Sequence, residues 1–191
     1  MAGSLVRVDL GSPSDRCAVI MRARLPLTLE RWRRRCVANA VDGVPAHATL
    51  LYPFIAPERL DETVRRMLAN VAARHAPIRH AHVGPATWPG VVYLALDPVH
   101  PAAELQADLA DAFPEFPIYG PGFDQDFVPH VTIAEGGQCV PLDDPAWRSA
   151  PQRTVVSALE VIARPVDGRW RTVWRIGLGG RDRSVAIAAR R

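Results

Sequence analysis

The amino-acid sequence predicts an α+β protein built from two related halves, and two observations carry this prediction. First, apolar segments of strand length alternate with amphipathic helical segments along the chain. Second, the order strand, helix, strand occurs over residues 17–52 and again over residues 91–134, about 80 residues later. We therefore expect a pseudo-symmetric molecule in which each half contributes a matching strand to a shared cleft.

The first half is predicted to contain two strands and two helices. Its elements are a strand over residues 17–24, a helix over residues 28–40, a strand over residues 46–52 and a long helix over residues 57–73. Pro57 marks the start of the long helix, because proline is well tolerated in a first helical turn. In the shorter helix, one apolar face is formed at helical spacing by Leu29, Trp32, Cys36 and Val37.

The second half repeats this order and adds closing strands. Its elements are an extended segment over residues 78–88, a strand over residues 91–96, a helix over residues 101–113, a loop over residues 114–129 and a strand over residues 130–134. Two further strands, over residues 155–163 and 169–178, close the fold. The long loop is rich in Pro, Gly and Phe, and loops of this length are commonly functional.

Size and composition indicate a self-sufficient fold. The chain has 191 residues, 48% of them hydrophobic and 23% charged, so it can bury a core without a disulfide or metal. We expect a single bilobal domain over residues 1–180 and a loose basic tail over residues 181–191. The net charge of +3 is too small to indicate a protein that coats nucleic acid.

The basic residues exclude one group of mechanisms. All 23 of them are arginine, and the sequence contains no lysine. Nucleotidyl-lysine ligation, Schiff-base chemistry and the P-loop lysine are therefore ruled out. Arginine cannot substitute in these reactions, because its guanidinium does not deprotonate in a protein.

The sequence also predicts the compartment. Cys17, Cys36 and Cys139 are widely spaced and show no metal-ligand pattern, which is typical of reduced thiols. Residues 1–10 lack the apolar region of a signal peptide, and no apolar run reaches the ~20 residues of a membrane helix. The expected protein is a cytoplasmic monomer that uses no metal and no cofactor.

The third element of each repeat carries nearly the same residues. Val44-Pro45-Ala46 precedes His47-Ala-Thr49-Leu, and Val128-Pro129 precedes His130-Val-Thr132-Ile. On a strand, alternate side chains share a face, so each strand presents an imidazole beside a hydroxyl above an apolar floor. A histidine on one strand is more often structural, but the same tetrad in both halves favours a functional pair.

Two imidazoles and two hydroxyls suit in-line displacement at phosphorus. A neutral histidine removes a proton from the attacking oxygen, and a protonated histidine donates one to the leaving oxygen. Histidine fits both roles because its unperturbed pKa is about 6.5. The hydroxyls of Thr49 and Thr132 would bind the non-bridging phosphate oxygens, so no metal is required.

This pair of motifs resembles the 2H phosphoesterase superfamily, and the text PAHATLLYPF of residues 45–54 looks like its 2′-5′ RNA ligase-like group. The likeness extends over about residues 17–178, although only the two tetrads are specific. It implies a bilobal α+β fold, with an antiparallel sheet flanked by helices in each lobe and the histidines facing each other in a central cleft.

The resemblance also implies an activity. It is metal-independent phosphodiester chemistry that opens a 2′,3′-cyclic phosphate, on an RNA end or a nucleotide, to a 2′-phosphomonoester. His47, Thr49, His130 and Thr132 match the four motif positions. By this likeness His130 would activate water and His47 would protonate the leaving oxygen.

One departure from the family pattern leaves the substrate open. Relatives that act on RNA often carry a basic residue shortly after the second motif, whereas Glu135-Gly136-Gly137 stands here. A carboxylate beside the phosphate would repel a long anionic polymer. The alternatives are another cyclic nucleotide, an ADP-ribose cyclic phosphate, or a nucleotide- or RNA-binding module without turnover.

Three other groups of residues are candidate sites. The four arginines within residues 31–35 are read as a solvated helix face whose Trp32 packs inward. His80 and His82 alternate on a strand, but no Cys, Asp or Glu at ligand spacing completes a metal site. The aromatic residues of the long loop, which would stack a nucleobase or fill the cleft edge, are Tyr119, Phe123 and Phe127.

Overall fold

The computed structural model describes residues 16–116, 118, 127–136, 140–166 and 168–180. The strands are β1 (Cys17–Arg22), β2 (His47–Leu51), β3 (Ile78–Trp88), β4 (Val91–Asp97), β5 (His130–Glu135), β6 (Thr154–Val156), β7 (Ala158–Ala163) and β8 (Arg171–Gly177). The α-helices are α1 (Leu27–Cys36), α2 (Ala38–Val41), α3 (Glu62–Arg74) and α4 (His100–Ala112). Two short 3₁₀ helices are η2 (Pro57–Arg59) and η3 (Pro145–Ser149). The expected tail, residues 181–191, lies outside the described residues.

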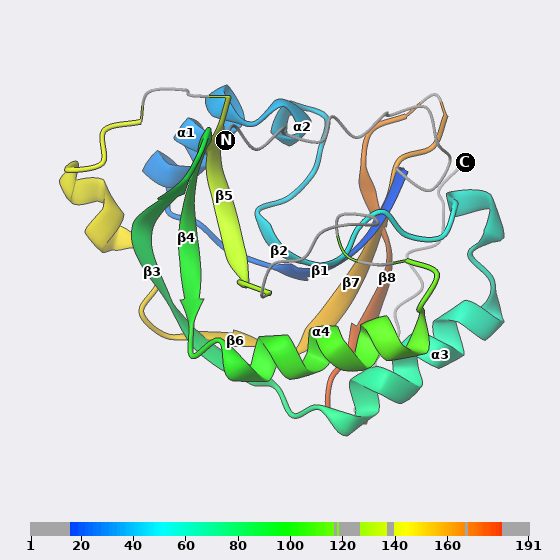
Figure 1. The fold of residues 1–191 in the computed structure, drawn as a ribbon. Coiled ribbons are helices and arrows are strands. Elements are labelled where there is room, and N and C mark those ends of the chain that lie inside the picture. Colours follow the sequence, from blue (N-terminus) through cyan, green and yellow to red (C-terminus); the bar gives the residue numbers. More distant parts are fainter. Residues whose placement is uncertain (1–15, 117, 119–126, 137–139, 167, 181–191) are drawn as a thin grey trace.

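The strands form two four-stranded sheets, which confirms the predicted α+β class. One sheet has the order β2-β1-β7-β8 and the other has the order β5-β4-β3-β6, with antiparallel pairing throughout. Figure 1 shows the two sheets splayed apart, with α1 and α2 at one end and α3 and α4 at the other. None of the helices in the described part of the chain is long and apolar enough to cross a membrane.

The internal repeat corresponds to two matching structural units, β1-α1-β2 and β4-α4-β5. In each unit the two strands pair with each other, and the second strand takes the edge of its sheet. The edge strands β2 and β5 contact one another, while α1 packs on β5 and α4 packs on β2. Because each helix crosses to the other unit's edge strand, the two strands that begin with histidine lie together at the centre.

A shared hydrophobic core fixes the two edge strands. The side chains of Leu50 on β2 and Ile133 on β5 are fully buried and belong to one cluster that includes both sheets and α4. Phe54, just after β2, meets Phe113 of the other unit edge to face, with ring centroids 5.2 Å apart. The alternate positions of β2 and β5 therefore face away from this core.

Three predicted elements differ from the structure. The strand expected over residues 155–163 is two strands, since β6 pairs with β3 in one sheet and β7 pairs with β1 in the other. A continuous apolar run indicates burial but does not identify its hydrogen-bonding neighbour, so this crossing was invisible in the sequence. The helix expected over residues 28–40 is interrupted at Val37, whose backbone is extended (φ −123°, ψ 114°).

The long helix also starts later than expected. α3 begins at Glu62 because Asp61 caps it, accepting a 2.9 Å hydrogen bond from the Val64 N–H. Residues 57–59 form only a separate 3₁₀ turn. Proline at a first helical position is compatible with either geometry, so Pro57 alone could not distinguish them.

Candidate active site

His47 and His130 occupy matching positions as the first residues of β2 and β5. Their strands have the same burial pattern, in which the histidine and the threonine are partly exposed and the residue between them is buried. Thr49 therefore shares a face with His47, and Thr132 shares a face with His130. The structure brings both imidazole–hydroxyl pairs onto adjoining edge strands.

Each imidazole is oriented by a backbone carbonyl two residues before it. His47 Nδ1 lies 2.7 Å from the Pro45 carbonyl oxygen, and His130 Nδ1 lies 2.8 Å from the Val128 carbonyl oxygen. A carbonyl only accepts hydrogen bonds, so Nδ1 carries the proton in both rings. Nε2 is then the nitrogen that accepts or donates a proton toward a ligand. Pro45 lies two residues before His47, whereas Pro129 lies one residue before His130. The feature that the two motifs share is therefore the backbone carbonyl two residues before each histidine.

Both imidazoles are neutral at pH 7. Burial is the main cause that lowers the pKa of His47 to about 4; the charges of Arg33, His130 and Arg22 act in the same direction, and the hydrogen bond to the Pro45 carbonyl opposes them. Burial also lowers the pKa of His130. A positive charge on one ring opposes a positive charge on the other. The site therefore readily holds only one imidazolium at a time.

The threonine hydroxyls are available to a ligand. Thr49 lies opposite Ile20 of β1, and Thr132 lies opposite Tyr93 of β4. Within the part of the chain that the structure describes, neither hydroxyl is recorded in a hydrogen bond. Each threonine lies two residues along the strand from its histidine, on the same face.

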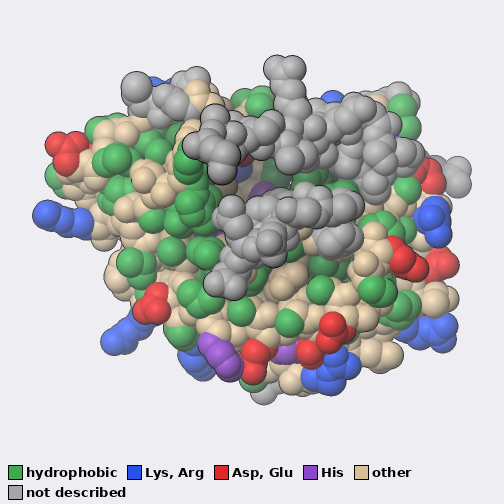
Figure 2. Space-filling view, viewed as in Figure 1, with side chains coloured by type: hydrophobic (Ala, Val, Ile, Leu, Met, Phe, Trp, Pro, Cys, Tyr) green, Lys and Arg blue, Asp and Glu red, His purple; other side chains and the backbone are tan. Residues whose placement is uncertain are grey.

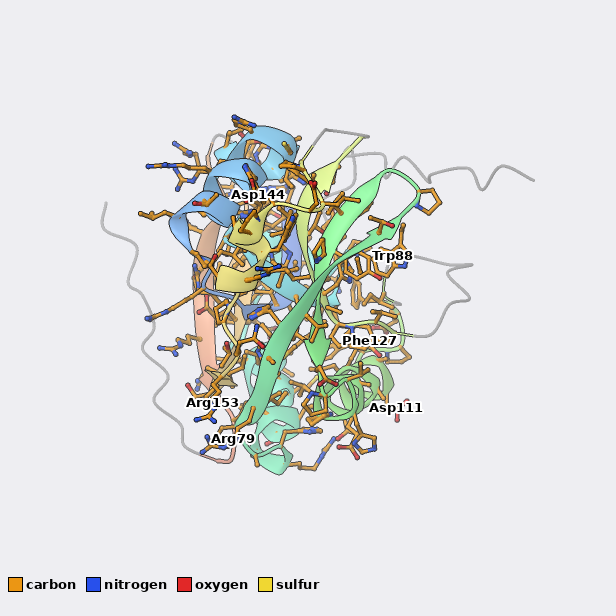
Figure 3. The ribbon with its side chains drawn as sticks, turned by 90° about the vertical axis from the view of Figure 1, so that its left-hand side faces the viewer. Arg79, Trp88, Asp111, Phe127, Asp144 and Arg153 are labelled. Atoms are coloured by element: carbon orange, nitrogen blue, oxygen red, sulfur yellow. The ribbon has the colours of Figure 1, made fainter. Side chains whose placement is uncertain are left out.

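An aromatic pair flanks His130, and sequence reasoning missed it. The rings of Trp88 and Tyr93 stack with centroids 4.0 Å apart, and they meet His130 edge-on at 4.6 and 5.4 Å. Their convergence depends on the register of three strands, because Trp88 ends β3 while Tyr93 lies opposite Thr132. Figure 3 shows Trp88 and Phe127 on the same side of the β3–β4 hairpin in that view.

A charged network flanks His47 instead, and sequence reasoning missed this network as well. Arg22 is the register partner of His47 and donates from Nε and Nη2 to the buried Glu160 carboxylate, at 3.0 and 2.7 Å. The Thr172 hydroxyl bonds both groups. The available signal was Glu160 itself, a single charge within the otherwise apolar strand β7. The two halves thus surround matching histidines with different chemistry.

Comparison with protein families identifies this arrangement. The family model described as the 2′-5′ RNA ligase superfamily matches residues 22–168, which include both histidine motifs. The chain belongs to this superfamily. The resemblance to the 2H phosphoesterases, inferred from the two tetrads, is thereby confirmed. Comparison with curated proteins found no match.

Solved structures support the fold of this superfamily member. A structure described as a phosphoesterase aligns with a TM-score of 0.52 and 17% identity, covering 86% of this chain and 98% of that one. E. coli LigT complexed with 3′-AMP aligns with a TM-score of 0.52 and 17% identity, covering 85% and 97%. E. coli LigT complexed with NADP+ aligns with a TM-score of 0.51 and 19% identity, covering 86% of this chain and 98% of that one. At these identities the likeness establishes the fold.

The remaining candidate residues of this superfamily member have other surroundings. Within residues 31–35, Trp32 packs inward against Trp147 at 5.2 Å, as expected. Arg33 corrects the interpretation of a wholly solvated face, because it is 3% exposed and bonds both Glu30 and the Val44 carbonyl. Its planar guanidinium satisfies several acceptors at once, which allows a charge to be buried there.

The His80 and His82 rings pack edge to face with centroids 4.9 Å apart. Among the described residues, no group of three or more His, Cys, Asp or Glu side chains could hold a metal ion. Of the loop aromatics, Phe127 packs against the hydrophobic core, which favours the core-filling interpretation for that residue. Tyr119 and Phe123 lie outside the described residues.

Proposed function

We propose that the protein is a metal-independent phosphodiesterase that opens 2′,3′-cyclic phosphates to phosphomonoesters. The observation that carries the proposal is the pair of imidazoles on adjoining edge strands, each held through Nδ1 by a carbonyl with Nε2 left for proton transfer. Membership of the superfamily supports phosphoester chemistry. The LigT structures complexed with 3′-AMP and with NADP+ support a nucleotide as the substrate.

The reaction is an in-line displacement. A water oxygen attacks phosphorus while one neutral imidazole removes a proton from the water. The bond from phosphorus to one ribose oxygen breaks, and the second imidazole, as its cation, donates the proton to that oxygen. In the order that the family resemblance implies, His130 activates the water and His47 protonates the leaving oxygen. Thr49 and Thr132 hydrogen-bond the non-bridging oxygens.

A bound phosphate would offset the positive charges that disfavour protonation of His47, the proposed acid. The guanidinium groups of Arg22 and Arg33 oppose an imidazolium at His47 in the free protein. An anionic phosphate next to the ring favours the charged form and raises its pKa in the complex. The site is therefore expected to gain its catalytic proton together with the substrate.

This electrostatic arrangement predicts an acidic pH optimum for kcat/KM, which reports the free enzyme. The pKa values of both histidines are depressed, so above their ordinary value of about 6.5 both rings are neutral and neither supplies the catalytic proton. We expect kcat/KM for 2′,3′-cyclic AMP to fall by about tenfold per pH unit above about pH 7. The two apparent pKa values belong to the coupled pair.

The measurement is a series of initial rates across pH at constant ionic strength, with circular dichroism to verify folding at each point. The profile of kcat should shift to higher pH than that of kcat/KM, since bound phosphate stabilises the imidazolium. A kcat/KM that stays constant up to about pH 8 would contradict a catalytic acid that is one of two buried histidines with depressed pKa values.

The proposal itself is tested by incubating purified protein with 2′,3′-cyclic AMP in excess EDTA and resolving the products. Formation of 2′- or 3′-AMP supports it, and the isomer identifies the leaving oxygen. Absence of product with 2′,3′-cyclic AMP, other cyclic nucleotides and an ADP-ribose cyclic phosphate, combined with measurable nucleotide binding, would instead indicate a binding module.

A further inference from the structure

A basic cavity lies beside the His47 half of the candidate site. It has a volume of about 700 Å³ and is lined by the end of β1, by α1 and α2, and by the segment that leads into β2. Five arginines line it against one acidic residue, Glu30. These arginines are Arg22, Arg24, Arg33, Arg34 and Arg169. An anionic ligand is the chemistry that this lining favours.

The arginines divide into those that build the wall and those free to bind. Arg33 is buried and donates from Nε and Nη2 to the Glu30 carboxylate and the Val44 carbonyl, so it belongs to the framework. Arg34 donates only through Nε to Glu30, at 3.3 Å, and is 69% exposed. Arg24 is exposed and, within the described residues, is not recorded in any hydrogen bond or ion pair. Arg24 and Arg34 therefore retain donors for a ligand.

The cavity adjoins the candidate active site through two neighbours of His47. Pro45, whose carbonyl orients His47, lines it, and so does Arg22, the register partner of His47. A ligand whose phosphate lies at His47 would therefore have this cavity next to it. Guanidinium groups suit a phosphate because their paired N–H donors match two of its oxygens.

We propose that this cavity binds a second phosphate of the substrate, the one attached to the 5′ oxygen of the nucleoside whose cyclic phosphate lies between the histidines. This inference rests on the proposed function and narrows its substrate class. A nucleoside 2′,3′-cyclic phosphate alone leaves the cavity unused. A 5′-phosphorylated nucleotide or an RNA 3′ end occupies it, because both carry a phosphate at that oxygen.

The cavity also changes how Glu135 is interpreted. That residue ends β5 in the other half and is opposite Val91, the first residue of β4. The arginines that line the cavity lie in the other half of the site, beside His47, and the cavity wall is formed there by β1, α1 and α2. A strand of RNA that approaches across the His47 half meets arginines, so a carboxylate beyond the second motif does not exclude an RNA end.

The test compares three substrates that differ only at the 5′ oxygen: adenosine 2′,3′-cyclic phosphate, its 5′-phosphorylated form and the dinucleotide ApA 2′,3′-cyclic phosphate. We expect kcat/KM to be about tenfold higher for the two substrates that carry the second phosphate, the scale of charge-assisted hydrogen bonds at an exposed site. The double substitution Arg24→Gln and Arg34→Gln should abolish this preference. The preference should also weaken as KCl rises, because salt screens exposed charges.

A matched control is available on the same helix. Arg31 and Arg35 are exposed but do not line the cavity, so Arg31→Gln with Arg35→Gln removes the same charge and should retain the preference. Equal kcat/KM for all three substrates in the native protein would overturn the proposal. So would a preference that survives in the Arg24/Arg34 double variant, since a group other than these two arginines would then be its source.

A binding measurement keeps this inference separate from the proposed activity. Adenosine 2′,5′-bisphosphate and adenosine 2′-monophosphate are titrated into the protein by calorimetry without turnover. The bisphosphate should bind about tenfold more tightly, and this difference should disappear in the Arg24/Arg34 double variant alone. If no cyclic phosphate is hydrolysed but this difference is found, the second-phosphate site stands and the hydrolase proposal fails. Equal affinities overturn the site whatever the activity.

Discussion

Replacement of either motif histidine by alanine is expected to reduce kcat/KM for 2′,3′-cyclic AMP by at least about 100-fold, because proton transfer by a positioned group contributes about 10²–10⁴-fold. The two effects should be far from additive when the substitutions are combined, since His47 and His130 act in one step. Initial rates of the His47→Ala and His130→Ala proteins in EDTA, alongside the native protein, measure this directly.

A matched control separates catalysis from general damage. His100 lies on the exposed surface of α4, where its Nδ1 is 3.3 Å from Glu104, and His100→Ala should retain native activity. Figure 2 shows histidine and charged side chains along the edge of the molecule over α4 and α3, away from β2 and β5. Turnover that survives both motif substitutions, in folded protein, would refute two-histidine catalysis.

Acidification is expected to destabilise the fold strongly between pH 6.5 and 4. Burial lowers the pKa of His82 to about 4, and the charge of His80 acts in the same direction. Burial lowers the pKa of His47 to about 4 as well. In this interval the unfolded chain binds more protons than the folded chain, so the free energy of unfolding falls as pH falls. Each histidine should contribute about 3 kcal/mol, fully present above pH 6.5 and lost by about pH 4.

Urea denaturation at a series of pH values measures this loss. His82 is 1% exposed, and its Nε2 lacks a hydrogen-bond partner among the described residues. His82→Leu removes the 3.3 Å contact between Nδ1 and the Pro151 carbonyl, but that carbonyl still accepts from the backbone N–H of residue 82, so the variant removes a titrating group and leaves the carbonyl bonded. That variant should lose about 3 kcal/mol less than the native protein on acidification. Gln152→Ala is the control, because Gln152 hydrogen-bonds the His82 carbonyl yet binds no proton. An unchanged pH dependence in His82→Leu would contradict the assignment.

The sequence by itself determined the local features of this protein. Strand alternation fixes which residues share a face, so the pairing of His47 with Thr49 and of His130 with Thr132 followed from spacing alone. The repeated tetrad identified the two halves and the superfamily. Helix spacing and apolar runs located most elements to within a few residues, because they depend on neighbours along the chain.

The tertiary structure decided everything that depends on register and on neighbours distant in sequence. The split of one apolar run between β6 and β7 follows from which strand each pairs with. Trp88 meets His130 only because three strands align, and Arg22 finds Glu160 only across β1 and β7. Burial of Arg33 depends on the Val44 carbonyl reaching it from another segment. Such contacts join residues far apart along the chain, and no periodicity in the sequence encodes them.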